Sequence, residues 1–194
     1  MTRKKVGVLI SGRGSNMSAL IEAARSPDYP AEIVGVLSNR AAAPGLEIAA
    51  REGIATASLA QSKFPSRDMF EDTMTQVLES WEVDYVCLAG FMRILGEDFV
   101  NRWQGRMINI HPSLLPAYKG VDTHERALAD GATEHGCTVH FVTVGLDEGP
   151  AILQASVRVL PDDTADTLAA RVLVQEHRIY PEALRMLALG ETGL

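Results

Sequence analysis

The chain has 194 residues, 46% hydrophobic and 22% charged, a composition typical of a soluble globular protein with a sizeable core. Its formal net charge of −7 argues against a nucleic-acid partner, because nucleic-acid-binding surfaces are basic. The apolar runs are of strand length and too short to span a bilayer, so we expect no membrane partner. Only Cys87 and Cys137 are present, which excludes a disulfide framework. We therefore expect free thiols in a reducing, cytoplasmic setting.

The first half of the chain alternates between the apolar patterns of strands and helices. Apolar strands separated by helices are typical of a mostly parallel sheet covered on both faces. We thus predict an α/β fold, a single-domain Rossmann-like twisted sheet with helices on both faces. The expected strands are Val6–Ser11, Ile33–Ser38, Thr56–Leu59, Tyr85–Ala89 and Met107–Ile110, and the expected helices are Asn16–Ala24, Gly45–Glu52 and Ser66–Ser80, the last with Ser66 as its N-cap.

The last third of the chain changes in character. Two strand patterns, Thr138–Val144 and Ile152–Leu160, flank a turn at residues 145–150, and this spacing predicts a hairpin that extends the sheet. A long terminal helix follows at Ala165–Leu189, and we expect Pro181 to break or kink it. No repeat or linker interrupts the pattern, so we expect a single domain, residues 1–194.

A glycine-rich turn, Ser11-Gly12-Arg13-Gly14-Ser15-Asn16, follows the first strand and opens the first helix. Backbone amides at a helix N-terminus can bind phosphate, and small residues allow a close approach. Met17 stands where the dinucleotide-binding fingerprint needs its third glycine, so this motif is excluded. From these residues alone, a phosphate site and a tight turn capped by Ser15 or Asn16 remain equally good interpretations.

Asn109 and His111 belong to the strand at Met107–Ile110 and its end, and they point to the same face because side chains alternate along a strand. The strand must end near His111, since Pro112 cannot donate to the ladder. Open α/β sheets bind ligands at the carboxyl ends of their strands. An amide donor and an imidazole at that place suit oxyanion stabilisation and proton transfer. A buried structural Asn–His pair is the alternative.

Asp147 lies in the turn Leu146-Asp147-Glu148-Gly149-Pro150, where an aspartate commonly bonds only its own backbone. It would acquire a chemical role if the fold brought it against His111, where its charge could hold an imidazolium. The histidines and cysteines show no metal-ligand spacing, so we expect no metal site.

Taken together, these motifs resemble those of the phosphoribosylglycinamide formyltransferases over nearly the whole chain, about residues 6–187. The resemblance implies a folate-dependent enzyme of purine biosynthesis that needs no metal. Its substrates would be small molecules, 10-formyltetrahydrofolate as co-substrate and N1-(5-phospho-D-ribosyl)glycinamide as formyl acceptor. The motifs that carry it are SGRGSN at Ser11–Asn16, LAGFMRIL at Leu88–Leu95, NIHPSLLP at Asn109–Pro116, VHFV at Val139–Val142, LDEGP at Leu146–Pro150 and QEHRIYP at Gln175–Pro181.

The resemblance also implies roles for single residues. The catalytic set would be Asn109, His111 and Asp147. The ribonucleotide would be bound by Gly14, Ser15, Asn16 and Glu176, and the folate by Arg67, Met92, Arg93, Ile94, Leu95, Asn109, Thr143, Val144, Gly145 and Leu146. Residues from about 1 to 100 would form the phosphate and ribonucleotide half, and residues from about 101 to 194 the catalytic and folate-binding half. Either a monomer or a homodimer would be compatible with these roles.

The chain departs from the family pattern at two places. Leu173 stands where relatives often carry Gln or Lys, and Val144-Gly145 replaces an acidic pair in the pterin loop. Three alternatives remain open: a formyltransferase acting on methionyl-tRNA, a formyltetrahydrofolate hydrolase, and a nucleotide-binding protein without catalysis. The first two normally carry an additional C-terminal or N-terminal domain, so we expect neither here.

Overall fold

The computed structural model describes residues 2–193 and contains one seven-stranded sheet in the order β3-β2-β1-β4-β5-β6-β7. The first five strands of that order are parallel, whereas β6 pairs antiparallel with both β5 and β7. The predicted α/β class and the C-terminal hairpin are thus confirmed. The strands are β1 (Lys4–Ile10), β2 (Ala31–Ser38), β3 (Ala55–Ser58), β4 (Tyr85–Leu88), β5 (Met107–His111), β6 (Glu134–Phe141) and β7 (Ala151–Arg158).

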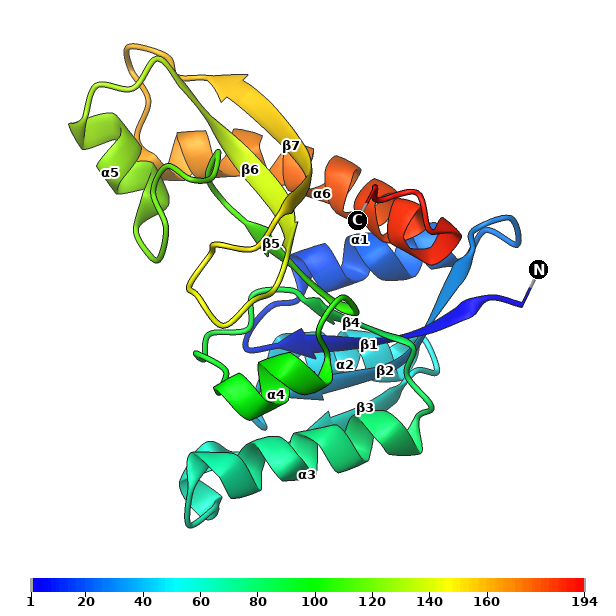
Figure 1. The fold of residues 1–194 in the computed structure, drawn as a ribbon. Helices are drawn as coiled ribbons and strands as arrows, with labels where there is room; N and C mark the ends of the chain where they lie inside the picture. Colours follow the sequence, from blue (N-terminus) through cyan, green and yellow to red (C-terminus); the bar gives the residue numbers. More distant parts are fainter. Residues whose placement is uncertain (1, 194) are drawn as a thin grey trace.

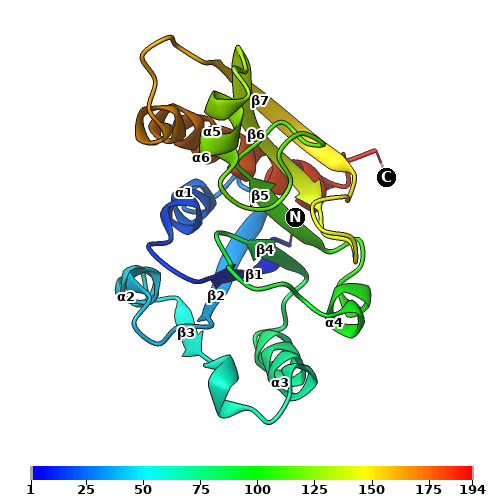
Figure 2. The same cartoon turned by 90° about the vertical axis from the view of Figure 1, so that its left-hand side faces the viewer.

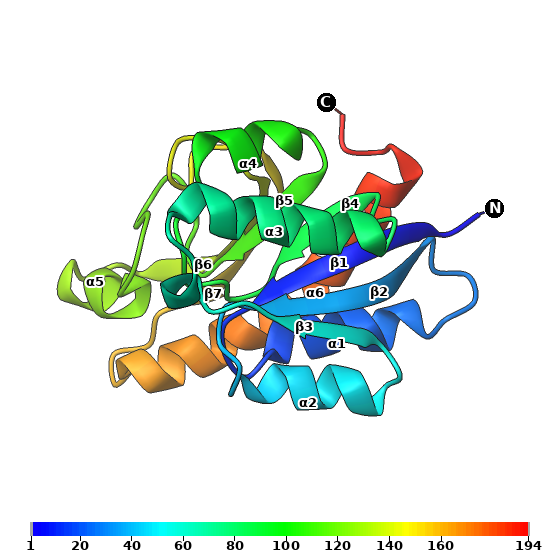
Figure 3. The same ribbon diagram turned by 90° about the horizontal axis from the view of Figure 1, so that it is seen from below.

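Helices cover both faces of the sheet, as a mostly parallel sheet requires. In Figure 3, α3 and α4 lie on one face and α1, α2 and α6 on the other. Each face has its own apolar core, one built around Met17 and Tyr180 and the other around Phe70 and Trp103. The helices are α1 (Ser15–Ala24), α2 (Pro44–Arg51), α3 (Arg67–Ser80), α4 (Glu97–Arg102), α5 (Thr123–Ala129) and α6 (Ala165–Leu189), with a 3₁₀ turn, η1, at Gln61–Lys63.

Two helix starts follow from capping residues that the sequence displays. The Ser66 hydroxyl accepts a hydrogen bond from the Met69 backbone N–H at 3.2 Å, which confirms the predicted cap of α3. At the start of α6, Thr164 and Thr167 form a reciprocal capping box. No helix within residues 2–193 is long and apolar enough to cross a membrane.

One expectation about the C-terminal third was wrong, the bounds of β6, and another, a break or kink at Pro181, was wrong as to the break. Strand β6 begins at Glu134 and ends at Phe141, not at Thr138–Val144, because β7 pairs with its early residues from Glu134 onward. Helix α6 continues through Pro181 without a break. Buried side chains on both sides of the proline pack on the core, and the Tyr29 hydroxyl donates to the Pro181 carbonyl at 2.7 Å. This packing stabilises the helix at Pro181, where proline removes one backbone hydrogen bond.

The carboxyl ends of β1, β4 and β5 meet at one edge of the sheet. Strand order reverses between β1 and β4, which is the position where open α/β sheets form ligand crevices. The loop after β5 and the loop between β6 and β7 lie at this edge together with α5, on the left in Figure 1 and facing the viewer in Figure 2. The short helices α4 and α5, absent from the sequence prediction, flank the edge.

Candidate active site

Asn109 is held in place by a neighbour on the adjacent strand. In the register of β5 and β6, Asn109 lies directly opposite His140, and its Nδ2 is 3.2 Å from His140 Nε2. His140 is 2% exposed, and its other ring nitrogen, Nδ1, lies 2.9 Å from the Phe141 carbonyl oxygen. Since a carbonyl only accepts, Nδ1 carries the hydrogen and Nε2 accepts from the Asn109 amide.

The environment of His140 favours this neutral form. Burial lowers the pKa of the His140 imidazole, partly opposed by its bond to the Phe141 carbonyl and by the nearby Asp147 carboxylate. The unprotonated Nε2 of the neutral His140 ring accepts a hydrogen bond from Asn109 Nδ2 and so orients the Asn109 amide. One N–H of the Asn109 amide is thereby used inside the protein, and the other remains free to donate to a ligand.

His111 ends β5 and is 5% exposed. Its Nε2 lies 2.9 Å from the Tyr118 carbonyl oxygen, to which it donates, and its Nδ1 lies 3.5 Å from Asp147 Oδ2. Both ring nitrogens therefore face oxygen acceptors, and a doubly protonated ring can donate to each of them. The fold thus brings together the two residues whose meeting the sequence could not show.

Asp147 is positioned by backbone rather than by side chains. Its Oδ2 accepts from the Gly120 N–H at 2.8 Å, and its Oδ1 lies 3.8 Å from His140 Nε2. Its own backbone adopts a left-handed conformation with φ of 51°, which Asp tolerates better than most residues. The carboxylate, 9% exposed, thus lies between two imidazole rings.

The glycine-rich turn leads into α1 without a side-chain cap. Gly14 is the N-cap residue, with φ of 73°, and Ser15 and Asn16 are already the first helical residues. Capping by Ser15 or Asn16, one of the two interpretations of this turn, is therefore not what the structure shows. Asn16 Nδ2 instead donates to Glu176 Oε2 at 2.7 Å, across 160 residues of sequence.

Glu176 comes from α6 and is 7% exposed. Burial raises the pKa of the Glu176 carboxyl, and the hydrogen bond from Asn16 lowers it in part. The Asn16 Oδ1 atom is buried and has no hydrogen-bond donor among residues 2–193. A buried acceptor without a donor is costly, so a ligand N–H or O–H at this position would be stabilised.

Two cavities converge on the cluster. One, of 600 Å³, extends from Asn109 and His111 to Asn16 and Glu176. The other, of 140 Å³, extends from Asn109 and His140 along the loop after β6, including the predicted residues Thr143, Val144, Gly145 and Leu146. Asn109 and Asp147 line both cavities, so two ligands can meet there.

The segment after β4 borders both cavities, and two of its four predicted folate residues line both. Arg93 and Ile94 line both, Met92 lines the larger one and Leu95 the smaller one. The Ser11 hydroxyl accepts from the Met92 N–H at 2.8 Å, which ties the segment to the end of β1. The Arg93 guanidinium bonds to the Gln61 side chain.

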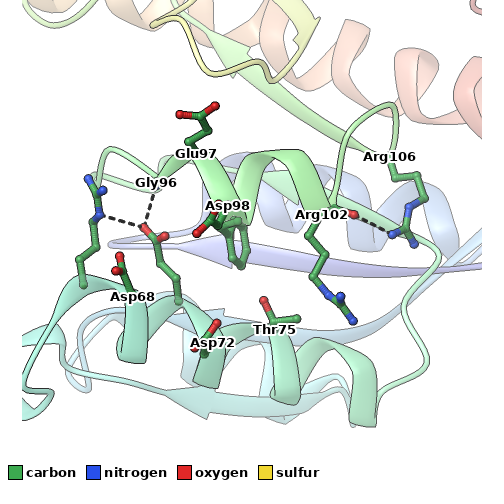
Figure 4. A pocket seen from close by; sticks show the side chains of 11 residues that line it. Asp68, Asp72, Thr75, Gly96, Glu97, Asp98, Arg102 and Arg106 are labelled. Carbon is green, nitrogen blue, oxygen red and sulfur yellow. Dashed lines mark hydrogen bonds and ion pairs between the residues drawn. The ribbon is translucent and has the colours of Figure 1, made fainter.

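Arg67 is the one predicted folate residue that lies apart. It lines a third cavity, of 810 Å³, between α3 and α4 (Figure 4), and neither cavity at Asn109 includes it. There its Nε lies 3.9 Å from Glu71 Oε1, which also accepts from the Gly96 N–H at 2.8 Å. Gly96 directly follows Leu95, so Arg67 lies beside the end of the predicted folate segment rather than within it.

Two further expectations concern residues outside the cluster. Among residues 2–193, no group of three or more His, Cys, Asp or Glu side chains is arranged to hold a metal ion. Leu173 lies on α6 and lines neither of the cavities at Asn109.

Sequence reasoning missed the groups that support the catalytic candidates. His140 is part of the motif VHFV but shows no metal-ligand spacing, so the sequence gives it no role, although a histidine within a predicted apolar strand is itself a signal. The Tyr118 carbonyl and the Gly120 N–H are backbone atoms, so residue type cannot reveal them. Gly120 offers only the hint that a glycine near a helix start marks a special backbone conformation, here with φ of 81°.

Comparison with known families agrees with this geometry. The family model described as formyl transferase matches residues 4–184. The chain belongs to the formyl transferase family. It is 49% identical over 183 residues to the phosphoribosylglycinamide formyltransferase of Escherichia coli, a match that covers 94% of this chain and 86% of that protein.

A larger relative and a solved structure are similarly close. The trifunctional purine biosynthetic protein adenosine-3 of Homo sapiens is 49% identical over 192 residues, which cover 99% of this chain but only 19% of the human protein. The crystal structure of phosphoribosylglycinamide formyltransferase from Brucella melitensis superposes with a TM-score of 0.93 at 51% identity, covering 96% of each chain. These matches confirm the Rossmann-like single domain and the resemblance, and they show that the chain is an enzyme of this family.

Proposed function

We propose that the chain transfers the formyl group of 10-formyltetrahydrofolate to the amine of N1-(5-phospho-D-ribosyl)glycinamide, in purine biosynthesis. The observation that carries this proposal is the meeting of two cavities at Asn109 and Asp147. A formyl transfer between two large substrates needs such a junction, because donor and acceptor must approach from different directions.

The ribonucleotide would occupy the larger cavity. Its phosphate would lie at the uncapped N-terminus of α1, against the backbone N–H groups of Gly14, Ser15 and Asn16. Glu176, at the same end of the cavity, would accept from hydroxyl or amine groups of this substrate. The amine would then point along the cavity toward Asn109 and His111.

The folate would occupy the smaller cavity and its rim. The pterin would contact the backbone of residues 143–146, and the formyl-bearing nitrogen would lie beside Asn109 and Asp147. Met92, Arg93, Ile94 and Leu95 would cover the remainder of the molecule. Arg67 would reach only the outer end of the folate, since it lines neither cavity at Asn109 and its guanidinium lies against Gly96, the residue after Leu95.

The reaction would begin with a nucleophile that needs no strong base. An α-amino group has a pKa of about 7.7–8.0, so a useful fraction is neutral near neutral pH. Its attack on the formyl carbon creates a tetrahedral adduct with an oxyanion. The free N–H of Asn109 would donate to that oxygen, and one donor of this kind contributes on the order of 3 kcal/mol in comparable sites.

The collapse of the adduct requires a proton on the folate nitrogen, which is a poor leaving group as an anion. The Nε2 of His111 is occupied by the Tyr118 carbonyl, so Nδ1, facing Asp147, is the ring atom left for proton transfer. In this mechanism Asp147 stabilises the imidazolium, and the pair passes a proton from the attacking amine to the folate nitrogen through a bridging water. The mechanism uses no metal and no covalent intermediate.

The setting we propose is one domain, residues 1–194, in the cytoplasm. The two cysteines, Cys87 and Cys137, are buried and free, in keeping with a reducing compartment. Residues from about 1 to 100 would supply the phosphate turn, and residues from about 101 to 194 the catalytic set and the pterin loop. Because one chain supplies all the proposed groups, a monomer and a homodimer would be equally competent.

The test is to incubate the protein with both proposed substrates and to measure acceptor-dependent release of tetrahydrofolate. We expect release that stops when the ribonucleotide is omitted. Release without any acceptor would indicate a hydrolase, and release that requires methionyl-tRNA would indicate a different transferase. Binding of the ribonucleotide without turnover would indicate a non-catalytic protein, and each of these outcomes would overturn the proposal.

A further inference from the structure

The loop between β5 and α5 supplies two backbone atoms to the catalytic cluster. The Tyr118 carbonyl accepts from His111, and the Gly120 N–H donates to Asp147, at 2.9 and 2.8 Å. The positions of both side chains thus depend on the path of this loop between residues 118 and 120.

Between residues 118 and 122 the backbone of the loop adopts conformations that are unfavourable in free energy. Tyr118 and Asp122 have left-handed backbones, with φ of 52° and 56°, a region that residues other than glycine rarely adopt. Gly120 between them has φ of 81°. A conformation of this kind persists only where surrounding contacts stabilise it.

Arg126 supplies such contacts from the outer side of the loop. From α5, its Nη1 donates to the Lys119 carbonyl at 2.7 Å and to the Val121 carbonyl at 3.2 Å. Its guanidinium carbon lies 5.5 Å from the centroid of the Tyr118 ring, within the range of a cation–π contact. Arg126 therefore contacts residues 118, 119 and 121, which include or directly flank Tyr118 and Gly120, the two residues whose backbone atoms hold His111 and Asp147.

We propose that Arg126 is a positioning residue of the reaction, which holds residues 118–121 in the conformation that orients His111 and Asp147. The expected effect of Arg126 on kcat rests on the proposed function, whereas its expected effect on the conformation of residues 118–121 does not. Arg126 lines neither cavity at Asn109, so it acts through the loop and not on a substrate. Arg suits this role because its planar, multi-donor head can bond two carbonyls and stack on an aromatic ring at once.

The loop has further contacts, among them the Tyr118 ring packed edge-on against the His135 ring, with the centroids 5.8 Å apart, and one ion pair. Lys119 Nζ lies 3.0 Å from Glu148 Oε1, and both side chains are substantially exposed. Exposed ion pairs of this kind contribute little to stability. Arg126 is also exposed, but it bonds two carbonyls of the loop at once, so it is the side chain on which we expect the path of the loop to depend.

The test compares Arg126→Met, which removes all donors, with Arg126→Lys, which keeps a cation and part of the donor set. Arg51→Met is the matched control, because Arg51 pairs with Glu47 on α2, away from this loop. We expect kcat of Arg126→Met to fall about tenfold, because small displacements of catalytic groups cost rate. The KM values for both substrates should stay within about twofold, Arg126→Lys should recover part of kcat, and the control should match the wild type.

A second measurement, hydrogen exchange of the Gly120 amide, is independent of activity. We expect faster exchange in Arg126→Met, since the bond to Asp147 opens more often. An unchanged kcat, or a lowered kcat with unchanged Gly120 exchange, would overturn the positioning role. If the wild type lacked formyl transfer, the proposed function would fail, while the exchange experiment would still decide what Arg126 does. Should Arg126→Met not fold, Arg126→Lys provides both measurements.

Discussion

The catalytic cluster and the rim around it differ sharply in how their side chains are held. Asn109, His111 and Asp147 are each hydrogen bonded to a neighbouring ring or backbone atom, and both histidines of the cluster are almost fully buried. The rim, by contrast, exposes apolar side chains without polar partners. These are Met92 at 61%, Ile94 at 75%, Val144 at 55% and Leu146 at 54% exposure.

This contrast follows from what each region would have to do. Groups that stabilise charge in a transition state act best when they are already oriented, so that no reorganisation is needed during the reaction. A rim that covers a large, flat co-substrate needs apolar area instead, and exposed apolar patches commonly mark ligand grooves. Substitutions in the cluster should therefore change kcat, and substitutions in the rim should change KM.

The largest effect should come from Asn109→Leu, which removes the proposed oxyanion donor at nearly constant size. We expect kcat to fall about 10²–10³-fold, with a smaller change in either KM. The bare Nε2 of buried His140 loses its donor, so unfolding free energy should also drop by about 1–3 kcal/mol. Steady-state kinetics with denaturant unfolding tests both; a kcat near the wild-type value would remove Asn109 from the mechanism.

Asp147→Asn should have the second largest effect, a fall in kcat of about 10²-fold. Removing the negative charge weakens the interaction of this side chain with His111 Nδ1, 3.5 Å away, on which the proposed proton transfer depends. Folding should change little, since Asn also tolerates the left-handed backbone and can accept from Gly120. The measurement is kcat from steady-state kinetics with thermal unfolding as control, and a normal kcat would reduce Asp147 to a turn residue.

Asn16→Leu should change binding rather than rate. The substitution removes a polar contact far from the transferring carbon, so we expect KM for the ribonucleotide to rise about 10–30-fold, with little change for the folate. Arg93→Met should instead raise KM for the folate, with little change in KM for the ribonucleotide. Kinetics with each substrate varied in turn tests the pair, and a rise confined to the folate KM in both variants would reverse the assignment of the two cavities.

Ile94→Ala should have a smaller effect of the same kind. The lost apolar area corresponds to about 1 kcal/mol, so KM for the folate should rise about fivefold. Thermal stability should not change, because the side chain is exposed. Val174→Ala is the matched control, since Val174 is 65% exposed on α6 and lines no cavity at Asn109. An equal response of both variants would show that the rim has no special role.

The smallest effect should be the pH dependence of stability in Glu176→Gln. Burial raises the pKa of folded Glu176 above the unfolded value of about 4.3, so the folded state keeps its proton to higher pH. The stabilisation this provides is complete below about pH 4 and is lost as pH rises through the folded pKa. The Gln variant has no carboxyl group to titrate at this position, so its stability does not fall in this way as pH rises. Its Tm should therefore gain a few degrees relative to the wild type between about pH 4 and about pH 7, and parallel Tm curves would contradict the raised pKa.

Much of the fold could be predicted because local patterns specify it. Five parallel strands and the capped helix α3 lie within a few residues of their predicted positions, and the C-terminal hairpin forms as predicted although β6 begins earlier, at Glu134. The short helices α4 and α5 escaped prediction because six or seven residues give too little periodicity. Pro181 misled the prediction because its local penalty is outweighed by burial of the helix on both sides.

At the site, local sequence patterns specify which residues carry chemistry and where their strands end. Asn109 and His111 share a face by strand alternation, and Pro112 ends the strand after them. The partners of these residues follow from the tertiary fold alone, because register between strands and the path of a loop depend on packing across the whole chain. His140 faces Asn109, Asp147 reaches His111, and Glu176 bonds to Asn16 across distances in sequence that no local pattern encodes.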